Sequence, residues 1–344
     1  MENQTITERI ANLLETAHKN GAFDGVALVA RGNEVLHRGA YGMANRENHT
    51  AHSLQTPFPI CSVTKQFTAL LVMQQVADGR LRVDGTLADY LPDAQISDGA
   101  KRITLRNLLM HTSGLPNLDD VPGFYENVNP RLTDPAYVLQ TYCAGVGTFA
   151  PGSQFRYNNA DYLALSAILE KVSGLPYAEL LQARILGPLK MRRTSLVSAR
   201  NPRRIAGYEK GTTGPVPEQP VYRLENFGAA GAMQSTVDDL LVWDRALDTD
   251  RLLPARWREI MFTSDPAKGY TAFGTWVYGY QKYGAKTPTL YERQGGIGAL
   301  KAQNLRVPED RISIILLSNL DTADLAAYTG NTLTCDLLRA IYEP

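Results

Sequence analysis

The sequence predicts an α+β fold in which both ends of the chain form one antiparallel sheet and a mostly helical lobe is inserted between them. Strand-like runs occur near the N-terminus and again after Gly269, whereas helix-like periodicity and loops dominate the segment between them. Pairing the terminal segments in one sheet, flanked by the first and last helices, is the simplest architecture for this order. We therefore expect one lobe from residues 1–65 and 231–344, a second from residues 66–230, and a site between them.

The N-terminal elements are predicted to be a helix followed by a hairpin. Residues 5–8 (Thr-Ile-Thr-Glu) have the pattern of a capping box, and an apolar stripe predicts that this helix ends at Gly21. Two strands follow over residues 25–31 and 34–41, because Gly32 and Asn33 between them suit a two-residue turn.

The remaining elements are predicted from the periodicity of apolar residues and from the glycine, proline and capping residues between them. A second capping box at residues 235–238 opens a helix. Helices are expected over residues 104–111, 135–142, 161–173 (with Asn159 as its cap) and 322–341, and strands over residues 273–282, 289–293, 299–306 and 312–318.

Composition restricts the kind of partner. Lys plus Arg equals Asp plus Glu at 35 each among 344 residues, so nothing indicates a nucleic acid or an anionic membrane. The sequence contains no run of about 18 apolar residues, so no membrane span is predicted. The polar, acidic N-terminus predicts a cytoplasmic protein. Cys61, Cys143 and Cys335 match no metal or disulfide spacing. We expect a small-molecule substrate and no cofactor or metal; the oligomeric state stays open.

A possible nucleophile and its base lie close together in the sequence. Ser62 begins a strongly apolar helix and Lys65 follows one turn later, so both side chains share a helix face. A lysine kept neutral by burial can take the proton of a serine hydroxyl, and the helix N-terminus offers N–H groups to an oxyanion. The alternative is a capping serine beside a solvated lysine. Cys61 is interpreted as a buried apolar residue.

Two further segments support the nucleophile. Tyr157 follows a Pro-Gly turn and precedes a helix, so its hydroxyl can pass a proton, while Asn159 can orient a substrate amide. The alternative is a core tyrosine with a capping asparagine.

The segment Gln294-Gly295-Gly296 begins a strand, and paired glycines let a ligand approach an edge strand closely. The N–H of Ile297, together with that of Ser62, is then a candidate for the oxyanion hole. The alternative is a flexible turn.

In this order, Ser62-Val63-Thr64-Lys65, Tyr157-Asn158-Asn159 and the glycine-rich strand start resemble the three motifs of the penicillin-recognising serine hydrolases. The Tyr-x-Asn form is similar to that of class C β-lactamases, DD-peptidases, D-aminopeptidases, D-amino-acid amidases and family VIII esterases. Residues 108–115 (Leu-Leu-Met-His-Thr-Ser-Gly-Leu) and 307–310 (Val-Pro-Glu-Asp) also resemble that family.

The resemblance implies a class C β-lactamase-like fold and a set of roles. Ser62 would form the acyl-enzyme, Lys65 and Tyr157 would share proton transfer, and Asn159 would contact the substrate amide. The N–H groups of Ser62 and Ile297 would form the oxyanion hole. His111 would be a structural helix end, and no cofactor is implied.

One departure from the family concerns the third motif, where relatives carry Lys-Thr-Gly or His-x-Gly. We assign Gln294 to that position, with Gly295 and Gly296 as substrate-binding residues; Lys286-Thr287-Pro288 lacks the required glycine. A neutral amide offers no charge to a carboxylate. The sequence therefore predicts a hydrolase of small amides or peptides, and the resemblance to D-amino-acid amidases implies D-amino-acid derivatives among them. The alternatives are a family VIII-type carboxylesterase, a weak β-lactamase or DD-peptidase, and a penicillin-binding sensor.

Overall fold

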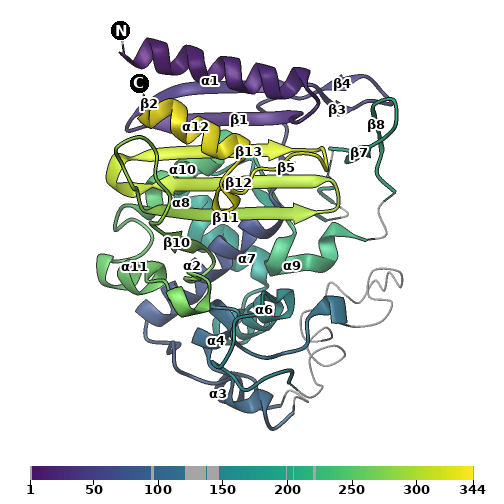
Figure 1. Cartoon of the computed structure of the whole chain (residues 1–344). Helices are drawn as coiled ribbons and strands as arrows, with labels where there is room; N and C mark the ends of the chain where they lie inside the picture. Colours follow the sequence, from purple (N-terminus) through teal and green to yellow (C-terminus); the bar gives the residue numbers. More distant parts are fainter. Residues whose placement is uncertain are drawn as a thin grey trace.

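A six-stranded antiparallel sheet forms the centre of the computed structural model (Figure 1). Its strand order is β10-β11-β12-β13-β1-β2, so the last strands of the chain lie beside the first. The strands are β1 (Gly25–Arg31), β2 (Glu34–Tyr41), β10 (Trp276–Tyr278), β11 (Leu290–Ile297), β12 (Leu300–Val307) and β13 (Ile312–Ser318). The structure describes residues 2–93, 97–120, 137, 147–198, 200–203, 205–219 and 222–343.

The pairing of the first and last strands in one antiparallel sheet agrees with the sequence prediction. β1 pairs with β13 from Gly25 opposite Ser318 to Arg31 opposite Ile312, and both strands are almost wholly buried. Strands covered on both faces are expected to be apolar throughout rather than alternating. The predicted strands over residues 25–31, 34–41 and 312–318 are confirmed.

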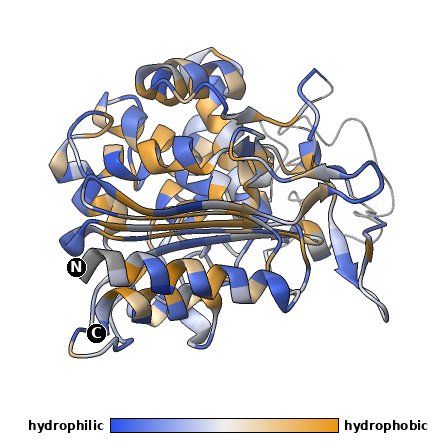
Figure 2. Cartoon of the chain, turned by 90° about the horizontal axis from the view of Figure 1, so that it is seen from above, coloured by the Kyte–Doolittle hydropathy of each residue, from blue (hydrophilic) through white to orange (hydrophobic). Residues whose placement is uncertain are grey.

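The terminal helices cover one face of the sheet, as Figure 2 shows from above. They are α1 (Glu2–Lys19) and α12 (Leu333–Tyr342), which pack against each other. Both helix starts were predicted wrongly. α1 begins before Thr5, so residues 5–8 are not a cap, and α12 begins at Leu333 because the Thr332 hydroxyl accepts a hydrogen bond from the N–H of Cys335.

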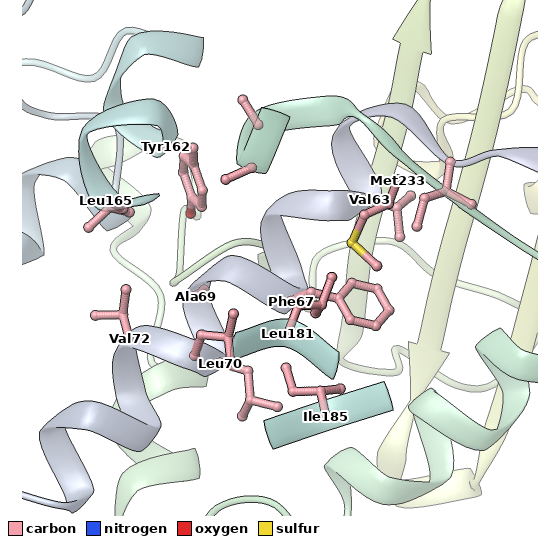
Figure 3. Close-up of a cluster of buried hydrophobic side chains, with 14 of the residues drawn as sticks. Val63, Phe67, Ala69, Leu70, Val72, Tyr162, Leu165, Leu181, Ile185 and Met233 are labelled. Atoms are coloured by element: carbon pink, nitrogen blue, oxygen red, sulfur yellow. The ribbon is translucent and has the colours of Figure 1, made fainter. Parts of the chain in front are cut away.

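The opposite face of the sheet carries the helices that position the candidate site. The central helix is α2 (Thr64–Ala77), in which every residue from Thr64 to Val76 is buried. Helices without an exposed face lie inside a protein core. α6 (Asn159–Ser173) and α10 (Val237–Leu247) are further helices of this layer, and Figure 3 shows the apolar side chains around α2.

Shorter elements complete the described part of the chain. The helices are α3 (Leu87–Tyr90), α4 (Leu105–Leu109), α7 (Tyr177–Leu181), α8 (Gly187–Leu189), α9 (Gly228–Gly231) and α11 (Ala255–Phe262). The strands are β3 (Met43–Asn45), β4 (Thr50–Ala51), β5 (Phe58–Pro59), β6 (Ser195–Leu196), β7 (Tyr208–Lys210), β8 (Pro215–Pro217) and β9 (Met233–Ser235). The predicted helix over residues 135–142 lies outside the described residues, and the boundaries of the two lobes stay a prediction.

Two predicted caps are displaced by one residue. α6 is capped by Asn158, whose side chain accepts from the N–H of Ala160, and not by Asn159. α10 is capped by Thr236, not by Ser235. No described helix combines the length and the apolar character needed to cross a membrane.

Candidate active site

Ser62 lies at the junction of β5 and α2, in the tight turn Cys61–Val63 that precedes the helix. The turn contains an unusual backbone, since Cys61 has a φ of +48° although it is not glycine. Pairing of the N–H of Ile60 with the carbonyl of Met233, at 2.9 Å, ties this turn to β9. A residue with φ and ψ outside the common regions is retained only where the surrounding structure holds it. Here the hydrogen bond between Ile60 and Met233 contributes to that hold.

Lys65 lies one helical turn after Ser62 and is fully buried. Its Nζ donates to Ser62 Oγ at 3.2 Å, to Asn159 Oδ1 at 2.8 Å and to the carbonyl of Ala230, in α9, at 2.6 Å. Burial lowers the pKa of Lys65 to about 8, and the positive charge of Arg293 acts in the same direction. The amine can therefore lose its proton near neutral pH.

Tyr157 contacts the same serine. Its hydroxyl lies 2.7 Å from Ser62 Oγ, and its ring lies between His111 and Trp276, with centroids 4.6 and 6.3 Å away. Burial alone would raise the pKa of Tyr157, but the charges of Lys65 and Arg293 outweigh it and lower that pKa to about 8. The serine hydroxyl thus has two candidate proton acceptors with similar pKa values.

Asn159 joins this cluster because its neighbour takes the cap position. Asn158 caps α6, so the Asn159 side chain is available to accept from Lys65. The N–H of Asn159 donates to Asn117 Oδ1 at 3.0 Å, which ties the start of α6 to the loop after α4. The structure therefore brings Ser62, Lys65, Tyr157 and Asn159 together, as the sequence analysis expected.

Arg293 is a site residue that the sequence analysis missed. Its Nε donates to the carbonyl of Ser62 and its Nη2 to the hydroxyl of Tyr157, both at 2.9 Å. The guanidinium lies 4.6 Å from the ring centroid of Trp276, and only 1% of the residue is exposed. Alternation along β11 could have identified it, because Arg293 precedes Gly295 by two residues and the two share a face.

The prediction for Gln294 is wrong, because strand alternation turns it away from Ser62. Gln294 is paired with Gln303, whose side chain donates to Glu292 on the face of the sheet that carries α12. Glu292 in turn accepts from the N–H groups of Ala327 and Tyr328, just before α12. The third-motif position facing Tyr157 is therefore held by a cation, Arg293, and not by a neutral amide.

The glycine pair is divided between the two faces in the same way. A Cβ on Gly295 would lie 2.8 Å from the Ser62 nitrogen and 2.6 Å from the Ile60 carbonyl oxygen, so only glycine fits there. A Cβ on Gly296 would instead meet the flexible Lys301 side chain at 3.8 Å.

The expectation for the Ile297 N–H is also contradicted. Ile297 and Leu300 flank the two-residue β11–β12 turn, and such a closing pair exchanges backbone hydrogen bonds. Successive N–H groups of a strand point to opposite sides, so Ile297 points its N–H towards β12 and Gly296 points its N–H towards the open edge beside Ser62.

His111 lies behind Tyr157 rather than beside Ser62. Its Nδ1 accepts from the N–H of Asn158 at 3.2 Å and lies 3.2 Å from Asp161 Oδ2. The Ser113 hydroxyl donates to the other carboxyl oxygen of Asp161 at 2.5 Å. Burial lowers the pKa of His111 and raises that of Asp161, so it disfavours the charged form of both groups beneath the site. No group of three potential metal ligands occurs in the described part of the chain.

The fold is that of the class that contains penicillin-binding proteins and β-lactamases. The D-amino acid amidase from Ochrobactrum anthropi SV3 superposes with a TM-score of 0.82 over 98% of each chain, at 24% sequence identity. Esterase EstB of Burkholderia gladioli is 35% identical over 202 residues, which are 56% of this chain and 51% of the esterase. Penicillin-binding protein 4* of Bacillus subtilis is 26% identical over 339 residues, which are 92% of this chain and 72% of that protein.

The family model described as Beta-lactamase matches residues 8–333. The chain therefore belongs to the β-lactamase family of serine hydrolases, whose members among its relatives include esterases, aminopeptidases, amidases and penicillin-binding proteins. The aligned region is about half the length of EstB.

Proposed function

We propose that this protein is a serine hydrolase that cleaves small amides or peptides, including D-amino-acid amides, through an acyl-enzyme on Ser62. The observation that carries the proposal is that Ser62 Oγ lies within hydrogen-bond distance of both Lys65 Nζ, at 3.2 Å, and Tyr157 OH, at 2.7 Å. A hydroxyl becomes a nucleophile when a positioned base takes its proton.

In the acylation step, Ser62 Oγ attacks the substrate carbonyl carbon and transfers its proton to the Tyr157–Lys65 pair. The oxyanion that forms accepts hydrogen bonds from the N–H groups of Ser62 and Gly296. Expulsion of the amine breaks the C–N bond, and the proton held by Tyr157 and Lys65 passes to the leaving nitrogen. Water then attacks the acyl carbon, with the same pair as its base, and releases the acid and Ser62.

The substrate class follows from how Arg293 is used. Two of its nitrogens are engaged by the Ser62 carbonyl and the Tyr157 hydroxyl, and the residue is buried. Because these two nitrogens are already engaged, we infer that Arg293 tunes Tyr157 and does not bind a substrate carboxylate. Neutral acyl groups are thus still the expected substrates, although the reason differs from the one inferred for Gln294. We assign the Asn159 side chain to the substrate amide.

A carboxylesterase is the second candidate, and the observation that favours it is the 35% identity with esterase EstB. The same acyl-enzyme serves esters, which are easier to cleave because an alkoxide or phenoxide leaves without full protonation. The amine leaving group of an amide needs a proton from Tyr157, so Tyr157→Phe separates the two. We expect this variant to lose more amide turnover than ester turnover.

The test compares turnover of four substrates by the native protein and by Ser62→Ala. The substrates are D-phenylalanine amide, L-phenylalanine amide, p-nitrophenyl butyrate and nitrocefin. We expect the first or third to be turned over most efficiently, and Ser62→Ala to lose about 10⁴-fold or more in kcat, as nucleophile removal does in serine hydrolases. Ser153→Ala, an exposed serine in a loop, is the matched control.

Two results would contradict this assignment. Full activity of Ser62→Ala would exclude the proposed acyl-enzyme mechanism. Preferred turnover of nitrocefin would indicate that the protein is a β-lactamase. A covalent adduct on Ser62 that persists for hours, followed by mass spectrometry, would instead indicate a penicillin-binding sensor.

A further inference from the structure

A cavity of about 650 Å³ lies on the far side of α9 from Lys65 and has no role in the chemistry described above. It is lined by α7 and the π-helical turn Gln182–Leu186, by β6 and the residues after it, and by the segment that leads into α9. None of the residues assigned to the Ser62 site lines it. Both its volume and its separation from that site suit an independent small-molecule site.

The walls of this cavity are mainly apolar. Leu181, Leu186 and Val197 are at least nine-tenths buried and form its floor. A π-helical turn is rare and is frequently found at functional sites, and here it contributes one wall. An aliphatic group of a ligand would be buried against these side chains.

Three polar side chains from residues 223–226 line the cavity. Asn226 is 6% exposed, and its buried Oδ1 has no hydrogen-bond partner, which is costly for a buried acceptor. Arg223, which is exposed, and Glu225, which is half-buried, also line the cavity, and neither side chain has a hydrogen bond or ion pair with any residue that the structure describes. Residues 223–226 therefore present one cation and two acceptors, one of them anionic, to the cavity.

We propose that this cavity binds a free amino acid with an aliphatic side chain. The ligand's carboxylate would pair with Arg223, its ammonium group would donate to Glu225 and Asn226, and its side chain would contact Leu181, Leu186 and Val197. A zwitterion matches the three unpartnered groups together, which neither a plain carboxylic acid nor a plain amine does. The binding part of this inference does not depend on which bond Ser62 cleaves, whereas the effect on Lys65 described next rests on the proposed function.

An occupant of the cavity would act on Lys65 through α9. Gly228 and Ala232, at the two ends of that single turn, line the cavity. On its other side, the carbonyl of Ala230 accepts from Lys65 Nζ at 2.6 Å and that of Ala229 from Thr68 Oγ1 at 2.7 Å. A shift of this short turn changes the length of the Lys65 hydrogen bond, so the bound amino acid is an effector of the catalytic base.

Calorimetric titration of the Ser62→Ala protein tests the binding, because it needs no turnover. The probes are L-leucine and D-leucine, with leucinamide lacking the carboxylate and N-acetyl-leucine lacking the ammonium group. We expect one leucine enantiomer to bind at one site and each derivative to bind about tenfold more weakly. Arg223→Gln is expected to abolish the discrimination against leucinamide, and Glu225→Gln the discrimination against N-acetyl-leucine.

Arg192→Gln is the matched control, since Arg192 is exposed and lines a different cavity. Leucine binding that is absent, or that Arg223→Gln and Glu225→Gln leave unchanged, overturns the site. In the native enzyme, saturating leucine is expected to change kcat at least twofold at saturating substrate. Leucine that raises only KM would be a competitor in the Ser62 cleft and would overturn the coupling to Lys65.

Discussion

At the scale of single residues, the candidate site is a buried cluster in which two cations share one ionisable tyrosine. Lys65 and Arg293 are both buried, and each lies within reach of the Tyr157 hydroxyl or ring. Burial raises the pKa of the adjacent Asp161 carboxyl, which disfavours its negative charge beside these two cations. The repulsion between the two positive charges is reduced either by loss of the Lys65 proton or by ionisation of Tyr157. Both changes leave a base beside Ser62.

The pH dependence of activity follows from this balance. The pKa of Lys65 and that of Tyr157 are both lowered to about 8, so the pair loses a proton as the pH rises through that value. Since the deprotonated pair is the base, kcat/KM is expected to increase from pH 6 to 9 with a slope of one proton and a midpoint near the shared pKa. A rate profile with p-nitrophenyl butyrate, corrected for spontaneous hydrolysis, measures it. A flat profile across this range would contradict the assignment of the base.

Substitution of Arg293 should move that midpoint. The Arg293 charge lowers the pKa of both Lys65 and Tyr157, so Arg293→Gln is expected to raise the midpoint of the pH profile. It should also reduce kcat/KM at pH 7 by about 10²-fold, in the range seen when a charged partner is removed from an active site. Stopped-flow or steady-state rates across pH 6–10 give both quantities.

Its neighbour in the sequence provides the control. Gln294→Lys places a new cation on the opposite face of β11, so both the pH midpoint and the ratio of nitrocefin to amide turnover are expected to stay within twofold of native values. If Gln294 occupied the third-motif position, as the sequence analysis assigned it, a lysine there would instead be expected to raise penicillin acylation. An increase in that ratio in Gln294→Lys would restore Gln294 as the residue that selects the substrate.

At the scale of elements, β11 supplies the site through the alternation of its two faces. A Cβ at Gly295 would press on the Ser62 nitrogen and the Ile60 carbonyl, whereas one at Gly296 points towards the Lys301 side chain. Gly295→Ala should therefore displace the turn that carries Ser62 and reduce kcat by about 10²–10³-fold, as loss of an oxyanion-hole donor does. Gly296→Ala keeps its N–H and is expected to stay within a few-fold of native activity. Equal losses in both variants would indicate that strand flexibility, and not the approach to Ser62, requires glycine.

The turn between β11 and β12 is held by a carboxylate from the segment after β8. Glu218 Oε1 accepts from the N–H of Ala299 at 3.0 Å, and the Tyr222 hydroxyl donates to Glu218 and lies 3.1 Å from the Ile297 carbonyl oxygen. Hydrogen bonds to a charged acceptor are stronger than neutral ones. We infer that Glu218 fixes the turn next to the Gly296 N–H.

Glu218→Gln tests whether Glu218 fixes the turn between β11 and β12. Loss of the charge should weaken the hold on the turn and reduce kcat by about tenfold with little change in KM, because a displaced oxyanion donor affects the transition state more than substrate binding. Glu209→Gln, an exposed carboxylate on β7, is the control. The melting temperatures of both variants should match that of the native protein; a kcat equal to the native value would remove Glu218 from the positioning of β11.

At the scale of the whole molecule, the sequence predicted the order of elements better than their connections to the site. The sheet strands over residues 25–31, 34–41 and 312–318 were predictable because buried β-branched runs and a glycine turn are local signals. The helix starts at Asn158 and Thr236 were displaced by one residue, since adjacent polar residues are equally good caps in isolation.

The third motif was misassigned for a different reason. Periodicity locates a strand but does not say which of its two faces meets a helix formed some 230 residues earlier. Only the contact between Gly295 and Ser62 establishes that Arg293, and not Gln294, shares the face of the nucleophile. Ser62 and Lys65 were predictable because one helical turn fixes their relation.

The packing of α2 links the sheet to the helices on the face that carries Ser62. Phe67 on α2 stacks on Trp243 of α10 with ring centroids 3.9 Å apart, and Trp243 Nε1 donates to Gln66 Oε1 at 3.1 Å. Residues of β1 and β13 belong to the same apolar core as α2 and α6. Because one core spans the sheet and these helices, we expect them to unfold together rather than as separate units.

Trp243→Ala tests that expectation at the centre of the core. Trp243 is fully buried, so its removal should lower the free energy of unfolding by about 3–5 kcal/mol. Trp243→Phe keeps most of the stacking and loses only the hydrogen bond to Gln66, so it should cost less. Urea unfolding followed by circular dichroism and by residual activity should give coincident single transitions in the native protein and in both variants. Activity lost at lower urea than the helical signal would mean that the sheet and the helices around Ser62 unfold independently, and that the core shared through α2 does not couple them.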